Sequence, residues 1–107
     1  MAVRKKSDYP IKDKRLSIRV SENDVLRLKN ISEKYNLVYL DIIKRGIEYI
    51  KQNDNNFDYT VSSSIKNKLL VIKVTDDELQ YIKTNVKNKN LTYFDAIMLG
   101  LKHYESL

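Results

Sequence analysis

Three hydrogen-bonding side chains alternate with apolar ones near the start of the chain. Arg15, Ser17 and Arg19 are interleaved with aliphatic residues, namely Leu16, Ile18 and Val20. A guanidinium group offers a fork of N–H donors and a positive charge, and a hydroxyl both donates and accepts. Such side chains suit contact with hydrogen-bond acceptors on an anionic partner. Because strict alternation is the period of a half-buried strand, we expect all three on its exposed face.

The segment that carries these residues occurs twice. Shifting the sequence by 54 residues places 16–50 on 70–104 without a gap. Identical positions include the pairs Leu16/Leu70, Ile18/Ile72, Val20/Val74, Lys29/Lys83, Asn36/Asn90, Leu37/Leu91, Tyr39/Tyr93, Asp41/Asp95, Ile43/Ile97 and Gly46/Gly100. A repeated unit this short usually cannot bury its apolar face alone, so we expect the two copies to pack together.

The first copy predicts a strand followed by two helices. Ser21 is a capping residue, and acidic residues follow it in the first turn of a helix. The apolar stripe of that helix has spacings of three and four, at Val25, Leu28, Ile31 and Tyr35. Asn36 ends it, because asparagine tolerates the left-handed conformation. A second helix begins near Val38 or Tyr39, and its stripe is Leu40, Ile43, Ile47 and Ile50.

The second copy predicts the same order of elements. The inward face of its strand is Leu70, Ile72 and Val74. Thr75 and Glu78 have the spacing of a capping box at the start of a helix. That helix has its stripe at Leu79, Ile82 and Val86, and Asn90 ends it. Thr92 is placed to cap the last helix, whose stripe is Phe94, Ile97, Leu101 and Tyr104.

These patterns predict an α+β, mostly helical chain of two β-α-α repeats. We expect a basic arm at 1–13, the first repeat at 14–51, a polar linker at 52–66 and the second repeat at 67–107. The linker reaches at most about 50 Å when extended, which is enough for the second strand to return beside the first. The two glycines, Gly46 and Gly100, lie inside helices, where glycine costs about 1 kcal/mol relative to alanine. Their recurrence at matching positions predicts close helix packing.

Composition narrows the class of protein. The chain of 107 residues has no cysteine, which excludes disulfides and thiolate metal sites. Neither a signal peptide nor an apolar run of about 20 residues is present, so we expect an intracellular, cytoplasmic protein that does not enter a membrane. Net charge is +6. Basic residues exceed acidic ones by four in 14–51 (nine against five) and by one in 67–107 (six against five). Such a balance favours a polyanionic partner.

Enzyme chemistry finds no support in the sequence. The two glycines do not form a phosphate-binding loop. Helix starts account for five of the acidic residues, namely Glu22, Asp24, Asp76, Asp77 and Glu78. Ser62, Ser63 and Ser64 lie in the predicted linker, and His103 has no cysteine near it. We therefore expect no catalytic residue, no metal site, no cofactor and no small-molecule substrate.

The segments RLSIRVSENDVLRLKNISEKYNLVYLDIIKRGIEYI and KLLVIKVTDDELQYIKTNVKNKNLTYFDAIMLGLKHY resemble the ribbon-helix-helix family of MetJ, Arc and CopG-type repressors. Together they cover about two thirds of the chain. Two copies in one small basic chain are similar to the double ribbon-helix-helix regulators of archaeal viruses. The resemblance implies a transcriptional regulator whose partner is double-stranded DNA and whose two strands pair antiparallel into a ribbon that enters the major groove.

The same resemblance implies which residues contact DNA. The outward strand positions are Arg15, Ser17 and Arg19 in the first repeat, and Leu69, Val71 and Lys73 in the second. In the family, the N-terminus of the second helix of each repeat binds a phosphate, and the matching positions are Val38, Tyr39, Thr92 and Tyr93. Arginine can contact guanine O6 and N7, lysine a base or phosphate, and apolar side chains the thymine methyl group.

Several alternatives stay open at the level of sequence. The repeats pair either within one chain, as a pseudo-dimer, or between chains, and a higher-order assembly on DNA is compatible with both. The basic arm, with Arg4, Lys5, Lys6, Lys12 and Lys14, is either a solvated tail or a segment that tracks phosphates or enters a minor groove. An antitoxin-type autoregulator and a protein-assembly or adaptor module would use the same fold.

Overall fold

The structure is a computed structural model that describes residues 13–52 and 65–107. The order of elements is β1 (Lys14–Val20), α1 (Glu22–Tyr35), α2 (Tyr39–Gln52), β2 (Lys68–Val74), α3 (Asp76–Asn88) and α4 (Tyr93–Glu105). The predicted fold class, α+β with two β-α-α repeats, is confirmed. No helix in the described ranges is both long enough and apolar enough to cross a membrane.

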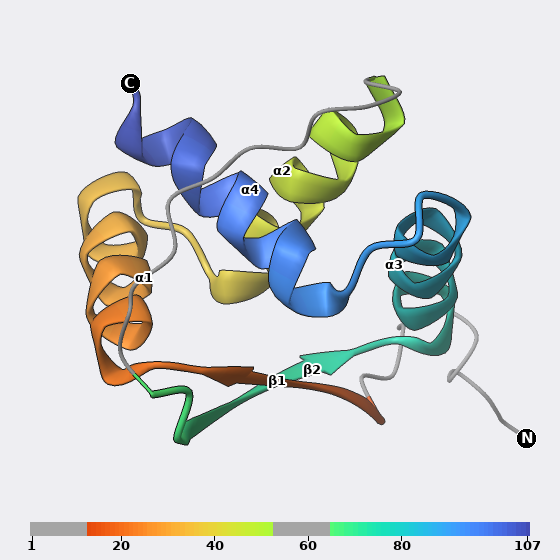
Figure 1. The fold of residues 1–107 in the computed structure, drawn as a ribbon, viewed down its shortest axis with the longest axis horizontal. Helices are drawn as coiled ribbons and strands as arrows, with labels where there is room; N and C mark the ends of the chain where they lie inside the picture. The colour runs from red at the N-terminus through yellow and green to blue at the C-terminus, as the bar shows by residue number, and fades with distance from the viewer. Residues whose placement is uncertain (1–12, 53–64) are drawn as a thin grey trace, which may run out of the picture.

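The two strands form one antiparallel ribbon within the chain (Figure 1). Arg15 lies opposite Lys73, and Arg19 lies opposite Leu69. One face of the ribbon is buried against the helices, through Leu16, Ile18, Val20, Leu70, Ile72 and Val74. The alternation along the sequence thus gives the strands one core face and one open face, as the period of two requires.

The four helices cover the inner face of the ribbon (Figure 1). Helices α2 and α4 cross at the centre, each with its first turn toward the ribbon, while α1 and α3 flank them on opposite sides. Contacts run between the repeats: α1 packs on α4, and α3 packs on α2. Each repeat therefore buries apolar surface of the other, as expected for a unit too short to bury its own apolar face.

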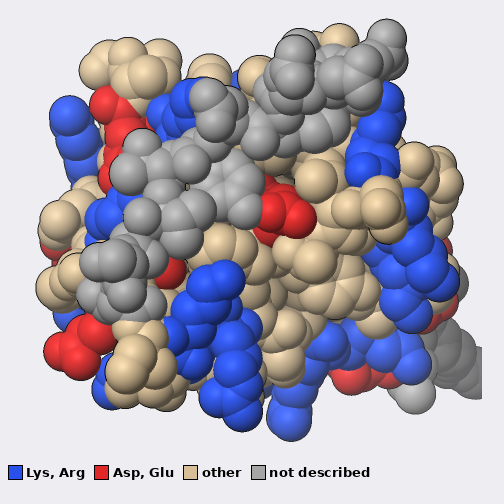
Figure 2. Space-filling view, viewed as in Figure 1, with Lys and Arg blue, Asp and Glu red and all other residues tan. Residues whose placement is uncertain are grey.

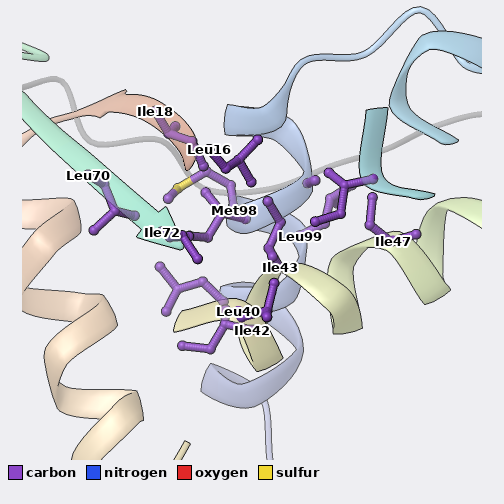
Figure 3. Packing of buried hydrophobic residues seen from close by; sticks show 14 of the residues in the cluster. Leu16, Ile18, Leu40, Ile42, Ile43, Ile47, Leu70, Ile72, Met98 and Leu99 are labelled. Carbon is purple, nitrogen blue, oxygen red and sulfur yellow. The ribbon is translucent and has the colours of Figure 1, made fainter. Parts of the chain in front are cut away.

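A single apolar core lies between the ribbon and the crossed helices (Figure 3). Met98 of α4 points toward Leu16 and Ile18 of β1 in this view. The predicted stripe of α2 is fully or nearly fully buried, at Leu40, Ile43, Ile47 and Ile50. Helix α4 is buried beyond its stripe, since Ala96, Met98 and Leu99 are also inaccessible to solvent.

Reciprocal capping boxes set the starts of three helices. At the start of α1, Ser21 and Asp24 each accept a hydrogen bond from the backbone N–H of the other. Thr75 and Glu78 do the same at α3, and Thr92 and Asp95 at α4. The first repeat uses aspartate where the second uses glutamate, and the carboxyl group of Asp24 is buried. Asn36 ends α1 in the left-handed conformation, with φ 55°, as predicted. Loss of such a cap costs about 1 kcal/mol.

The two glycines lie where α2 and α4 cross. A Cβ added to Gly46 would stand 1.7 Å from the carbonyl oxygen of Ala96, and one added to Gly100 would stand 1.8 Å from that of Ile42. Neither glycine has a positive φ. Their role is therefore close backbone approach, and the predicted tight helix packing is confirmed.

An ion pair connects the first helix to the end of the last one. Arg27 of α1 donates through Nε to Glu105 Oε2 at 2.9 Å and through Nη2 to Oε1 at 2.7 Å. Asp24 adds a third contact, 3.4 Å from Nη1. The hydrogen bonds to Glu105 raise the pKa of Arg27 further above its ordinary value, against the opposing effect of burial. The matching position in the second repeat is Tyr81, so this clamp exists on one side of the molecule.

We expect Arg27→Ala to lower the free energy of unfolding by about 1 kcal/mol, because a bidentate pair is lost while solvent still screens Glu105. A double-mutant cycle with Glu105→Ala, measured by urea unfolding, isolates the pair. Lys29→Ala, at an exposed position of the same helix, is the control and should change stability little. Additive effects of the two substitutions would contradict a stabilising pair.

Candidate nucleic-acid interface

The open face of the ribbon brings together the six predicted strand residues. Arg15, Ser17, Arg19 and Lys73 are exposed. Leu69 and Val71 are 56% and 47% exposed, and they lie two residues apart on the same strand face. The face therefore combines cationic donors with two uncovered apolar groups.

The strand register fixes which of these residues are neighbours. Ser17 lies opposite Val71 at the centre, with Arg15 opposite Lys73 on one side and Arg19 opposite Leu69 on the other. From Arg15 to Arg19 the strand advances about 13 Å, or about four base-pair steps of B-DNA. Two like charges directly opposite each other are destabilising in a strand pair. An anion or a set of acceptors over the Arg15–Lys73 end would relieve that repulsion.

A matching pair of lysines begins the two strands. Lys14 and Lys68 occupy equivalent positions in the repeats, and both are exposed. In Figure 2, Lys and Arg side chains gather along the edge of the molecule that the ribbon forms in Figure 1. Basic side chains therefore accompany the open face in both halves.

The helix starts predicted as phosphate anchors carry carboxylates. The N–H of Val38 donates to Asp41 Oδ2 at 3.1 Å, and the N–H of Thr92 donates to Asp95 Oδ2 at 2.8 Å. Thr92 Oγ1 also accepts from the N–H of Asp95, whereas Val38 has no such group. Because these two N–H groups are already engaged, a phosphate would rely on the next residues in the first turn.

Those next residues are Tyr39 and Tyr93. Both side chains are half-buried and pack against the core. Their place in the fold accounts for the recurrence of tyrosine at this position, as packing at the helix start.

The start of α4 in the second repeat has more basic surroundings than the start of α2 in the first repeat. Lys83 and Lys87 of α3 line a shallow pocket of about 290 Å³ together with Thr92 and Tyr93. The matching residues on α1 are Lys29 and Glu33, so one of the two positive charges is absent there. The second repeat thus has the less polar strand face, on β2, and also the more cationic surroundings at the start of its second helix, α4.

Of the basic residues grouped with the predicted arm, Lys14 lies within the described residues, and it begins β1. Arg4, Lys5, Lys6 and Lys12 lie outside the described residues, as does most of the predicted linker. The roles proposed for these segments stay predictions.

The histidine lies away from the ribbon, near the end of α4. Burial lowers the pKa of His103, and the positive charge of Arg45 lowers it further. The imidazole packs edge-on against the Tyr104 ring, with centroids 5.0 Å apart. Among residues 13–52 and 65–107, no three His, Asp or Glu side chains are grouped so that they could hold a metal ion.

Some residues of this surface were missed by sequence reasoning. Lys68 could have been found, since it repeats Lys14 after 54 residues. Asp41 and Asp95 also recur, and their spacing of three from Val38 and Thr92 signals a carboxylate at each helix start. Lys83 also recurs, since it repeats Lys29, but a lysine on a helix is commonly part of a solvated face, and Lys87 aligns with Glu33 and had no such signal.

We compared the chain with protein-family models, curated proteins and solved structures, and none of them matches it.

Proposed function

We propose that this protein is a sequence-preferring, double-stranded DNA-binding regulator of transcription that inserts the β1–β2 ribbon into the major groove. The observation that carries the proposal is the ribbon register, which sets Arg15, Arg19 and Lys73 on one open face while the opposite face is buried in the apolar core. A two-stranded ribbon fits the major groove, which is about 12 Å wide. Arginine and lysine on its face meet guanine O6 and N7 there.

Contacts with the phosphate backbone of DNA would position the ribbon. Lys14 and Lys68 begin the strands at matching places, suited to phosphates on either side of the groove. The N–H groups of Tyr39 and Tyr93 are placed at the starts of α2 and α4, where a helix favours an anion. Because the ribbon forms within one chain, a single molecule would bring a complete reading face to DNA.

Affinity for DNA should fall steeply with salt. If Lys14, Lys68, Lys83 and Lys87 each neutralise one phosphate, binding weakens about 150-fold between 50 and 200 mM salt. A gel shift on random duplex across this range measures the slope, and Lys83→Ala should reduce it by about 0.9 while weakening selected and random duplexes equally. An affinity that does not change with salt would contradict the role of these lysines.

A second candidate function draws on the apolar part of the ribbon. Leu69 and Val71 are exposed side by side on one strand face, as in a surface that binds another protein. An assembly or adaptor module would use this face without DNA. Absence of any gel shift at the lowest salt, with pull-down of a protein that is lost in Leu69→Ser, would favour this candidate over DNA binding.

A further inference from the structure

The reading face of the ribbon lacks the symmetry of the scaffold that holds it. The register is centred on Ser17 and Val71, which a shift of 54 residues exchanges, so the two repeats are related by a pseudo-twofold axis at this pair. The same operation places Arg15–Lys73 on Leu69–Arg19. One end of the ribbon thus has two cations, and the other has one cation and a leucine.

We infer that the ribbon binds a non-palindromic DNA site in one fixed orientation, with guanines at the Arg15–Lys73 end and thymine methyl groups at Leu69 and Val71. The inference rests on the proposed function, since it assigns the bases that the same face would read. It names a property that the repeat by itself does not imply, because duplicated DNA-binding units ordinarily favour matched half-sites.

The chemistry at the first end favours guanine. Arg15 and Lys73 are donors only, and as opposite residues their Cβ atoms lie about 5 Å apart. Guanine presents two acceptors in the major groove, whereas adenine presents one acceptor and one donor, and cytosine presents a donor. Two adjacent cations without an acceptor therefore match neighbouring guanines and reject cytosine at the same positions.

The chemistry at the centre and at the other end of the ribbon, where Val71 and Leu69 lie, favours thymine. Leu69 and Val71 have no hydrogen-bonding groups and keep about half of their surface exposed. In the groove they would cover polar base edges at a cost, unless they meet the C5-methyl group of thymine. Burying one methyl group corresponds to about a fourfold gain in affinity. Arg19, opposite Leu69, would retain one guanine contact at this end.

Two other asymmetric features could set the orientation instead. Lys87 replaces Glu33 beside the helix start of the second repeat, and the basic arm precedes only the first repeat. A test of orientation must therefore distinguish the contribution of the strand faces from the contributions of Lys87 and the arm. The chain has no cysteine, so one introduced cysteine gives a unique attachment point for a probe.

Glu22→Cys and Asp76→Cys provide a matched pair of attachment points. Both residues are exposed, are related by the 54-residue shift, and follow the ends of β1 and β2 (Figure 1). An iron chelate attached to either cysteine cleaves nearby DNA when hydroxyl radicals are generated. The full-length chain is bound to a duplex selected from a random-sequence library. We expect each probe to cleave one flank of the site, and the two probes to cleave opposite flanks.

The double substitution Arg15→Leu, Leu69→Arg moves the doubly cationic end to the other end of the ribbon and leaves the core unchanged. On the same duplex, the flanks cleaved from Glu22→Cys and Asp76→Cys should then be exchanged. Circular dichroism melting verifies that the variant is folded. If it is not, cleavage by the two probes in the otherwise unsubstituted chain still decides between one orientation and two.

Cleavage of both flanks by each single probe would overturn the inference, because the protein would then bind in both orientations. Flanks that stay unchanged in the folded double variant would also overturn it and assign orientation to the arm or to Lys87. These two results leave DNA binding intact. Failure to retain any duplex at 50 mM salt would instead contradict the proposed function itself.

Discussion

Gly46→Ala should destabilise the protein by about 3 kcal/mol or more, and Gly100→Ala should do the same. The added Cβ would meet the carbonyl oxygen of Ala96 at 1.7 Å, or that of Ile42 at 1.8 Å, and both are backbone atoms inside helices. A flexible side chain could rotate away, but here α2 and α4 must move apart. Because Leu40, Ile43, Ile47 and their partners fill the space around this crossing, that movement opens the core.

Whether Gly46→Ala lowers or raises stability distinguishes the effect of close helix packing from the intrinsic helix propensity of the residue. In an isolated helix, replacing glycine by alanine stabilises by about 1 kcal/mol. Thr84→Ala, at an exposed position of α3, serves as the control and should be neutral or slightly stabilising. Urea unfolding of the three variants gives the comparison. An increase in stability for Gly46→Ala would contradict the close crossing of α2 and α4.

Arg19→Ala should weaken binding to the preferred duplex by about 1–3 kcal/mol, or roughly 5- to 150-fold, and relax the preference at one base pair. Arg19 stands opposite Leu69, which cannot replace its hydrogen bonds. Lys14→Ala is the matched control, because Lys14 lies at the strand end and is assigned to a phosphate. It should weaken all sequences about equally.

Competition gel shifts with single-base variants of the preferred duplex measure both effects. A loss for Arg19→Ala that is equal on every sequence would make Arg19 a phosphate contact. The same loss pattern in Lys14→Ala and Arg19→Ala would leave the discrimination to Arg15 and Lys73.

The sequence predicted the elements and their limits because each is encoded locally. Alternation defined β1, the 54-residue repeat then predicted β2, and Ser21, Thr75 and Thr92 marked helix starts that capping boxes occupy. Asn36 takes the left-handed conformation that ends α1. These features depend on residues at most four apart. The repeat gives the first-helix cap and the terminating asparagine twice, whereas the Thr92 hydroxyl has no counterpart at Val38.

The register and the depth of burial depend on tertiary contacts and could not be predicted. That Ser17 faces Val71 follows from how both repeats seat on one core, and only this register makes Arg15 and Lys73 neighbours. Met98 and Leu99 lie outside the apolar stripe of α4, yet both are buried, because the helix is surrounded by other elements. The buried carboxyl group of Asp24 likewise follows from packing around the α1 cap.

The most direct test of ribbon insertion into the major groove is binding to base analogues at the guanines of the selected site. In 7-deazaguanine the N7 acceptor of the major groove is absent, whereas inosine lacks only the N2 amino group of the minor groove. We predict that 7-deazaguanine weakens binding about tenfold in the unsubstituted protein and little in Arg19→Ala at the guanine that Arg19 contacts, while inosine changes little. Weakening by inosine with no effect of 7-deazaguanine would place the protein in the minor groove and contradict insertion of the ribbon into the major groove.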